Sequence, residues 1–487
     1  MQALQYLRPT LYISSFFTIG MAVLMLVPAG VDFADGNADW RVFFISAVLV
    51  AGLSLMGLIA MRAPLPHFSV RFGFMVTTLL WALVALACAL PFYFSGLKLS
   101  FAQALFEAMS GLTTTGSTVI VGLDAAPRGI VLWRAMLQGV GGLGIVAIGL
   151  FLFPFLRVGG MQLFRTESSD RSDKILPRVR QITAALCMLY AGLFVACAFA
   201  YMALGMTPFD GVVHALATIS TGGMSGHDAS FGYFAASPAL LWTASFFMVC
   251  GGLPLILLVG LVVHSRTDLF RDMQVRVFLS VIVFTSLTLA LWLALTGQRP
   301  FFDALTHSTF NVVSVITTTG FASQDYLGWG ALPIGYFFFL TFFGGCSGST
   351  SGGIKIYRLI ILWQALTRSV RKLIYPSSVA VMRYGDKVVE PEVFESVVVF
   401  LIGFVGLMVV MTLLLCTVSG LDLLTALSGV VTALCNVGPG IGPVIGPSGT
   451  FAPLDSFSIS ILTAAMLLGR LEIMTVIVLF TPLYWRD

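Results

Sequence analysis

The feature that most constrains this chain is a succession of apolar stretches, each about as long as a membrane is thick. A helix needs about 20 predominantly apolar residues to span the hydrocarbon core of a bilayer. Only 10% of the residues are charged, compared with about 25% in soluble domains. The sequence therefore predicts an all-α polytopic membrane protein embedded in the lipid bilayer. The ten candidate spanning segments are 11–30, 42–61, 74–94, 129–156, 183–204, 238–263, 277–296, 331–366, 393–419 and 456–484.

Four shorter apolar segments lie between the spanning ones, over 101–113, 209–220, 302–317 and 422–435. Each is too short to cross a bilayer, and each ends in a polar turn that contains glycine. Irregular backbone at membrane depth is tolerated only where protein buries it or where it lines a water-filled cavity. We therefore expect four re-entrant half-helices that meet inside the protein.

An internal repeat relates these half-helices. The segment Phe106–Gly116 aligns without gaps to Phe310–Gly320, and Val213–Gly223 fits the same positions. Ser428–Gly438 is a weaker copy that keeps the final glycine. Each copy lies between two spanning segments, so the repeated unit is helix, half-helix, glycine turn, helix. We expect four pseudo-symmetric units around one central pore, after a two-helix prefix: prefix 1–72, unit 1 73–157, unit 2 181–264, unit 3 276–368 and unit 4 392–485.

The repeated turn has the chemistry of a cation pore. A half-helix directs the partial negative charge of its C-terminal end toward the membrane centre, and rings of backbone carbonyls replace the hydration shell of a cation. Glycine permits the positive φ or close backbone approach that such a turn requires. A single Thr-Thr-Gly turn is also an ordinary loop terminus, but four copies at equivalent positions favour ion coordination.

Acidic residues are placed where they would attract cations or cap helices. Carboxylates at a pore mouth raise the local cation concentration, whereas Asp at a helix start is an ordinary N-cap. Both interpretations stay open for Asp210, Asp303 and Asp422. The acidic residues of the outer loops and half-helices are Asp32, Asp35, Asp39, Glu107, Asp124, Asp210, Asp228, Asp303, Asp325, Asp422 and Asp455.

Basic residues predict the orientation. Of the 26 Lys and Arg, only Arg41, Lys98, Arg128, Arg134 and Arg299 fall on the side opposite the termini, and Lys355 and Arg470 fall within membrane segments. The other 19 share the side of both termini. Because cytoplasmic loops carry the excess of Lys and Arg, we expect both termini in the cytoplasm.

Three further motifs, together with the repeat, resemble the TrkH/KtrB-type potassium-transport family over essentially the whole chain. They are Phe343–Lys355, Leu467–Glu472 and Asn436–Gly440, and the two-helix prefix is typical of the TrkH branch. In that family each filter glycine and the two residues before it line the potassium sites. Glycine rather than serine at Gly116 favours potassium over sodium by the same analogy. The resemblance implies a filter made of Thr114, Thr115, Gly116, Thr221, Gly222, Gly223, Thr318, Thr319, Gly320, Asn436, Val437 and Gly438.

The segment 344–353 interrupts the eighth spanning segment with five glycines in ten residues. Each glycine in a helix interior costs about 1 kcal/mol relative to alanine, so this segment is not expected to be helical. From its residues it is either a loop along a water path or a close helix-packing seam. The family resemblance implies an intramembrane gate below the filter, formed by Gly344, Gly345, Ser347, Gly348, Ser349, Thr350, Ser351, Gly352 and Gly353.

Two cations accompany this gate. Arg470 lies inside the last apolar segment, where a buried charge is costly and marks a functional residue. It would oppose cation passage or hold the loop shut, and the alternative is a structural pair with Glu472. Lys355 would reach the inner surface or donate to the loop, and the sequence favours neither.

The resemblance implies gated potassium uptake across a bacterial inner membrane by a homodimer, with a TrkA-like cytoplasmic ring that senses NAD(H) or ATP/ADP. The chain has no nucleotide motif of its own, so nucleotide control must come through that partner. The basic segments 157–180 and 368–387 are candidate docking surfaces, although charge asymmetry explains them equally well. The alternative function is a sodium-permeable protein or a symporter coupled to H⁺ or Na⁺.

Other function classes are not expected. The sequence shows no cluster of catalytic or metal-ligating residues, so it predicts no enzyme, no covalently bound cofactor and no metal other than potassium at the filter. It also shows no basic run interleaved with aromatic residues, so we expect no nucleic-acid partner.

Overall fold

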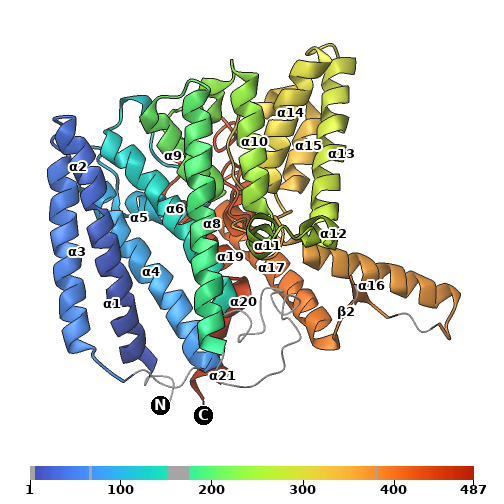
Figure 1. Cartoon of the computed structure of the whole chain (residues 1–487), viewed down its shortest axis with the longest axis horizontal. Coiled ribbons are helices and arrows are strands. Elements are labelled where there is room, and N and C mark those ends of the chain that lie inside the picture. Colours follow the sequence, from blue (N-terminus) through green and yellow to red (C-terminus); the bar gives the residue numbers. More distant parts are fainter. Residues whose placement is uncertain (1–5, 65–68, 152–174, 379–380, 386, 487) are drawn as a thin grey trace.

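The computed structural model describes residues 6–64, 69–151, 175–378, 381–385 and 387–486, and these are mostly helical (Figure 1). In this part of the chain the extended backbone is one short antiparallel hairpin, β1 (Arg383–Tyr384) with β2 (Lys387–Val388), and one bridge between Phe343 and Ile354. The first and last described helices lie at the same end of the molecule (Figure 1).

Seven helices of the described residues are long and apolar enough to cross a membrane, or nine if two bent pairs are each counted as one span. The chain is therefore a multi-pass membrane protein. The seven are α1–α2 (Leu7–Leu24 and Leu26–Ala34), α3 (Trp40–Ala60), α4 (Val70–Phe94), α6 (Arg128–Phe151), α8 (Ile175–Ala203), α13 (Met273–Leu295) and α17 (Pro391–Val418).

The burial pattern of these helices suits lipid. On α17, Phe404 and Leu415 are buried, whereas Ile402 and Leu413 are 67% and 56% exposed. Apolar residues thus cover both the packed face and the outer face of the helix. Contiguous apolar surface of this kind is rare on soluble proteins, and a hydrocarbon environment removes its cost.

Four short helices correspond to the expected half-helices: α5 (Phe101–Leu112), α9 (Pro208–Ile219), α14 (Phe301–Ile316) and α18 (Leu423–Cys435). Each packs against the helix before it and the helix after it in its own unit. In addition, α6 packs on α9, α10 (Pro238–Gly252) on α14, and α19 (Ser456–Arg470) on α5. These contacts arrange the units in chain order around an axis, and the last unit contacts the first.

The half-helices begin in different ways. Ser100 forms a capping box with Gln103, and Thr207 accepts a hydrogen bond from the Asp210 amide. Asp422 accepts one from the Thr425 amide and is a true N-cap. Of the three aspartates for which capping was open, only Asp422 therefore caps, whereas Asp210 and Asp303 lie within the first turn of their helices.

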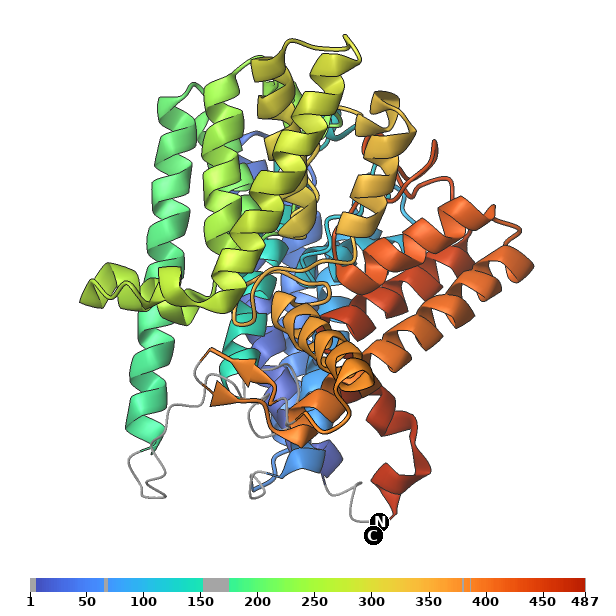
Figure 2. The same cartoon turned by 90° about the vertical axis from the view of Figure 1, so that its right-hand side faces the viewer.

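Two segments predicted as single straight spans are bent. In the sixth, α10 is followed by α11 (Leu255–His264) at an angle of 107°. Pro254 lacks an amide hydrogen and directly follows Gly252 and Leu253, so the helix ends there. Consequently α11 and α12 (Asp268–Arg271) lie across the direction of the spanning helices (Figure 2).

The tenth segment bends by 110° between α19 and the pair α20 (Ile473–Ile477) and η6 (Val478–Phe480). Glu472 occupies the junction with φ +62°, a conformation that ends a right-handed helix. Sequence periodicity did not reveal this break, because every residue around it except Arg470 and Glu472 is apolar or small.

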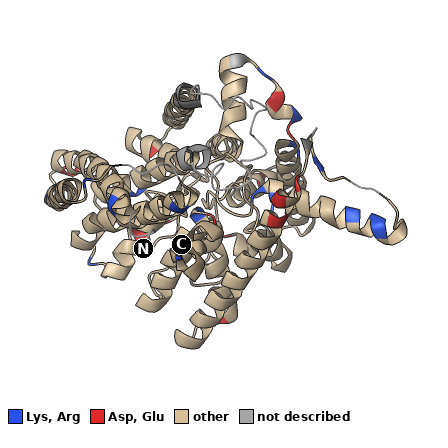
Figure 3. Cartoon of the chain, turned by 90° about the horizontal axis from the view of Figure 1, so that it is seen from below, with Lys and Arg blue, Asp and Glu red and all other residues tan. Residues whose placement is uncertain are grey.

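The eighth segment is interrupted as predicted, between α15 (Ala331–Leu340) and α16 (Ile356–Ile374). Helix α16 projects sideways from the body of the protein, in the half nearer the termini (Figure 1), and it carries Arg368, Arg371 and Lys372. Seen from below, basic residues are drawn in blue toward its free end (Figure 3). The end of the fourth predicted segment (152–156) and most of the basic segment 157–180 lie outside the described residues. The remaining short elements are η2 (Leu123–Ala125), η4 (Ser230–Phe234), η5 (Tyr326–Trp329) and α21 (Pro482–Trp485).

Candidate functional site

The four half-helices end in the same backbone conformation. The first residue of each turn is left-handed although it is not glycine: φ is 53° at Thr114, 53° at Thr221, 58° at Thr318 and 55° at Asn436. A left-handed conformation costs about 1–2 kcal/mol for an L-residue, and a β-branched one is a genuine outlier. Four copies of the same strained conformation indicate that the surrounding structure imposes it for a purpose.

Backbone hydrogen bonds fix each turn. The amide of the second turn residue donates to the carbonyl five residues earlier, as in a Schellman motif. The third residue is a left-handed glycine in every copy, with φ of 87° at Gly116, 72° at Gly223, 83° at Gly320 and 117° at Gly438. The four amide bonds are Thr115 to Ser110 at 2.8 Å, Gly222 to Ala217 at 2.8 Å, Thr319 to Ser314 at 2.8 Å and Val437 to Thr432 at 3.0 Å.

The four turns meet and form a closed ring. A Cβ on Gly116 would overlap the Gly222 carbonyl oxygen, and one on Gly223 would overlap that of Thr319. A Cβ on Gly320 would overlap the Val437 oxygen, and one on Gly438 would come within 2.9 Å of the Thr115 oxygen. Each glycine therefore lies against the middle carbonyl of the next unit, and the fourth unit lies against the first. All twelve predicted filter residues belong to this ring.

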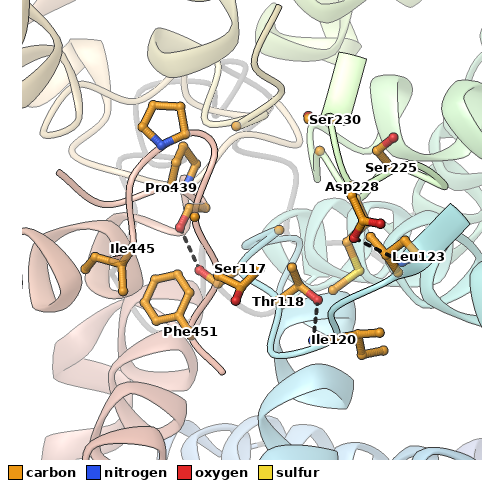
Figure 4. Close-up of a pocket in the computed structure, with 18 of the residues that line it drawn as sticks. Ser117, Thr118, Ile120, Leu123, Ser225, Asp228, Ser230, Pro439, Ile445 and Phe451 are labelled. Carbon is orange, nitrogen blue, oxygen red and sulfur yellow. Dashed lines mark hydrogen bonds between the residues drawn. The ribbon is translucent and has the colours of Figure 1, made fainter. Parts of the chain in front are cut away.

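A cavity of about 70 Å³ lies on one side of the ring, and all four turn glycines line it. In Figure 4, Ser117, Thr118, Ser225 and Asp228 surround this cavity together with apolar residues of the later loops. The Ser117 hydroxyl donates to the Gly438 carbonyl at 2.7 Å and so joins unit 1 to unit 4. This cavity, called the vestibule below, lies on the side of the ring from which the half-helices enter.

A buried ion pair supports the ring from behind. Glu107 on α5 and Arg134 on α6 are almost completely buried, and Arg134 Nε donates to Glu107 Oε1 at 2.7 Å. Glu107 also accepts the Val119 amide at 3.0 Å. The expectation that Glu107 attracts cations at the pore mouth is wrong, because its carboxylate is buried and bonded to Arg134 and to the loop after Gly116.

The intramembrane loop (residues 344–353) contacts the opposite side of the ring. The Gly352 amide donates to Thr318 Oγ1 at 2.7 Å, and the Thr350 and Thr221 hydroxyls are 3.1 Å apart. A Cβ on Gly352 would come within 2.5 Å of the Cys435 carbonyl oxygen. The loop thus touches units 2, 3 and 4 at or just before the first residue of each turn, away from the vestibule.

Broken helix α10 helps to hold this loop. The amides of Cys346 and Thr350 donate to the Gly252 and Gly251 carbonyls at 2.9 and 3.1 Å. The Leu255 amide donates back to the Gly348 carbonyl at 3.0 Å. The break at Pro254 therefore frees backbone groups that the loop satisfies, as burial requires. The segment is a loop and not a helix-packing seam, so the second interpretation of its glycines is wrong.

Every gate residue named from the sequence lies in or against this loop. Arg470 is 4% exposed, and its Nη1 donates to the Thr350 carbonyl at 2.9 Å. Glu472 pairs instead with Arg358, at 2.5 Å, so the alternative Arg470–Glu472 pair is wrong. Lys355 Nζ donates to the Ser351 carbonyl, which decides between its two open roles in favour of the loop.

Sequence reasoning missed two residues of this site. Arg358 was counted among the inner-side charges, yet it is 3% exposed and also lies 3.6 Å from the Phe400 ring centre. Its spacing of three residues from Lys355 was the available signal, because both would lie on one helix face. Gln138 is fully buried against the turn of unit 2, and nothing in the sequence singled it out.

Together these features define a polytopic membrane protein in which four re-entrant turns close into one ring, with a loop below it. The family model TrkH, described as cation transport protein, matches residues 41–486. The chain belongs to this family.

Two curated relatives and one solved structure agree with this assignment. The Trk system potassium uptake protein TrkI of Halomonas elongata is 43% identical over 484 residues, covering 98% of this chain and 97% of that protein. TrkH of Escherichia coli K12 is 37% identical over 427 residues, 86% of each chain. The crystal structure of the potassium transporter TrkH from Vibrio parahaemolyticus matches with a TM-score of 0.90 at 32% identity, over 99% of this chain and 100% of that one. These matches confirm the predicted family and fold class.

Proposed function

We propose that this chain is the pore-forming subunit of a bacterial potassium uptake system, with a potassium-selective filter formed by the four turns. The observation that carries the proposal is the closed ring in which each turn glycine lies against the middle carbonyl of the next unit. Carbonyl oxygens in such a ring replace the hydration shell of a cation. The names of the relatives, all Trk potassium uptake proteins, support potassium as the ion.

The gate in this proposal is the intramembrane loop together with Arg470 and Lys355. Two observations support it. The loop contacts the turns directly on the side opposite the vestibule, and both cations donate to its carbonyls. A positive charge directly below a cation site opposes cation passage. Movement of the loop would carry the Arg470 contact with it, so the same motion would open the path and displace the charge.

Regulation and assembly complete the proposal. We infer that two such chains form a homodimer in the bacterial inner membrane, with both termini cytoplasmic. A TrkA-like ring that binds NAD(H) or ATP/ADP would dock on the cytoplasmic side. The charge distribution supports this orientation, and α16 offers Arg368, Arg371 and Lys372 at the end that would face the partner.

Ion flux from proteoliposomes containing the purified protein tests the function. We expect potassium and rubidium to pass at least about tenfold faster than sodium, the scale of filter discrimination worth about 1.4 kcal/mol. Equal rates for potassium and sodium would contradict a selective filter and favour a sodium-permeable protein. Potassium accumulation driven by an imposed H⁺ or Na⁺ gradient, without a membrane potential, would instead indicate coupled symport.

A further inference from the structure

Unit 2 differs from the other three at the middle of its turn. The other units place Thr115, Thr319 and Val437 there, whereas unit 2 has Gly222. Gly222 is not among the residues with positive φ, so backbone conformation does not require a glycine at this position. A Cβ at Gly222 would overlap the amide carbon of Gln138, which belongs to α6 of unit 1. The side chain missing from this turn is therefore replaced by one from the neighbouring unit.

The Gln138 amide bonds to the turn on both sides of Gly223. Its Nε2 donates to the Gly222 carbonyl at 2.6 Å, and its Oε1 accepts the Met224 amide at 3.1 Å. Gln138 is fully buried. The Gly222 oxygen is the one that lies against Gly116 in the ring. Gln138 therefore fixes the position of one of the four ring oxygens. Its amide also donates a hydrogen bond to that oxygen, which makes the oxygen a weaker ligand for a cation.

One helical turn earlier, Arg134 extends the same contact. Residues four apart lie on one face of a helix, and Arg134 Nη1 donates to the Ser225 carbonyl at 2.7 Å. The pair with Glu107 holds Arg134 in place. One face of α6 thus binds the backbone of unit 2 from Gly222 to Ser225. Units 1 and 3 position their middle residues by hydroxyl pairs with the residue just before the turn: Thr113 with Thr115 and Thr317 with Thr319, each at 2.7 Å. Asn436 Nδ2 of unit 4 also donates to the Thr115 hydroxyl at 2.9 Å.

We propose that Gln138 is a selectivity-determining positioning residue: it takes the place of a side chain at Gly222 and holds that carbonyl in the ring. This inference rests on the proposed filter function. Without the amide, the Gly222 carbonyl loses a donor and gains free space, so it adapts more easily to a smaller cation. Selectivity should then fall while the pore still conducts.

The test is a double-mutant cycle at Gln138 and Gly222, with the potassium-to-sodium flux ratio as the readout. We expect Gln138→Ala to lower the ratio about tenfold, the scale of one buried hydrogen bond, with potassium flux changed about threefold at most. Gly222→Ala should lower it similarly, because the new methyl group overlaps Gln138. Combined, Gln138→Ala and Gly222→Ala should restore most of the ratio, because the methyl group then occupies vacated space.

Two further variants separate positioning from general stability. Gln138→Met keeps the volume without the amide and should also lower the ratio, even if the alanine variant folds poorly. Gln364→Ala removes a partly buried glutamine, remote from the ring, that bonds in the same two-sided way to the backbone of Arg383, at 2.7 and 3.0 Å, and should leave the ratio unchanged.

Three outcomes decide the result. An unchanged ratio in the Gln138 variants, or additive losses in the double variant, would overturn the inference. A wild-type protein without potassium preference would instead contradict the proposed filter function.

Discussion

The ring of turns and the intramembrane loop lie against each other but are built in opposite ways. The ring consists of four copies of one strained backbone conformation, and its contacts repeat from unit to unit. The loop exists once, touches three of the four units, and is held by contacts that have no counterpart elsewhere in the described residues. The difference fits the proposed division of roles, in which the four repeated turns form a fixed ion site and the single loop is the moving gate.

The largest effect should follow from breaking the ring itself. In Gly223→Ala the Cβ would overlap the Thr319 oxygen in a residue whose φ is +72°. A backbone displacement costing about 3 kcal/mol should reduce potassium flux about 100-fold. The control is Gly335→Ala, since a Cβ there meets nothing within 4 Å. Normal potassium flux through a correctly folded Gly223→Ala protein would show that the ring is not on the ion path.

Removing the positive charge of Arg470 below the ring should weaken the proposed barrier to cations. Repulsion between two unit charges is worth about 2 kcal/mol at about 8 Å in an effective dielectric of about 20. Basal potassium flux of Arg470→Ala, measured without a regulatory partner, should therefore rise about thirtyfold. Arg276→Ala, which removes an exposed arginine, is the control. A basal flux equal to that of the wild type would remove Arg470 from the barrier.

A smaller change should loosen the loop while keeping every charge. The Thr350 hydroxyl lies 3.2 Å from the Ile219 carbonyl oxygen and 3.0 Å from that of Gly251. Thr350→Val removes this donor at nearly constant volume, which costs about 1 kcal/mol. Basal flux should rise about fivefold with an unchanged potassium-to-sodium ratio. If the ratio falls instead, loop and ring do not have separate roles.

The sequence predicted the repeated ring more fully than the single loop, because only the ring has copies that can be compared. The repeat located the ring because Thr114, Thr221 and Thr318 occupy matching positions that can be aligned by eye. From its residues alone the loop was predicted as a break in a helix, and its place below the filter came only from the family resemblance. Its contacts with Gly251 and Arg470 join residues about 100 positions apart, and no local pattern encodes them. The bends after Gly252 and Arg470 were missed for the same reason, because the loop and Arg358 stabilise the broken ends.

Charged residues show where composition misleads. Glu107, Arg134 and Arg358 were assigned to the pore mouth or a membrane surface, yet all three are buried and paired. A count of charges by side treats each one as exposed. A buried charge that stabilises the interior is recognised only when its partner in the fold is known. Gln138 was missed because it is uncharged and so enters no count of charges.

The smallest effect concerns the loops on the vestibule side of the ring. His227 lies 2.6 Å from Asp124 and 3.4 Å from Asp210. Burial, the largest single influence, lowers the pKa of His227, but the hydrogen bonds and charges of Asp210 and Asp124 together raise it above 6.5. The hydrogen bond from His227 lowers the pKa of Asp124. The ion pair between His227 and Asp124 is therefore fully formed below the ordinary pKa of histidine. It is lost as the pH rises through the raised pKa of His227.

This dependence predicts the behaviour of His227→Gln. A partly exposed pair contributes about 1 kcal/mol at most. The thermal unfolding temperature in detergent should drop by about 1–2 °C at about pH 5.5, a small shift for a chain of this size. At about pH 8.5 the drop should be smaller. A larger loss at high pH than at low pH would contradict the ion pair, and the potassium-to-sodium ratio should stay unchanged throughout.

The most direct test of the central claim is to locate the ion. Crystals of the protein grown in rubidium should show anomalous density on the axis enclosed by the carbonyls of Thr115, Gly222, Thr319 and Val437 or by the adjacent turn carbonyls. Excess potassium should abolish that density, whereas excess sodium should leave most of it. Rubidium density at this position, displaced by potassium but poorly by sodium, is the predicted result. Density found only outside the ring, or none within it at saturating rubidium, would contradict the account.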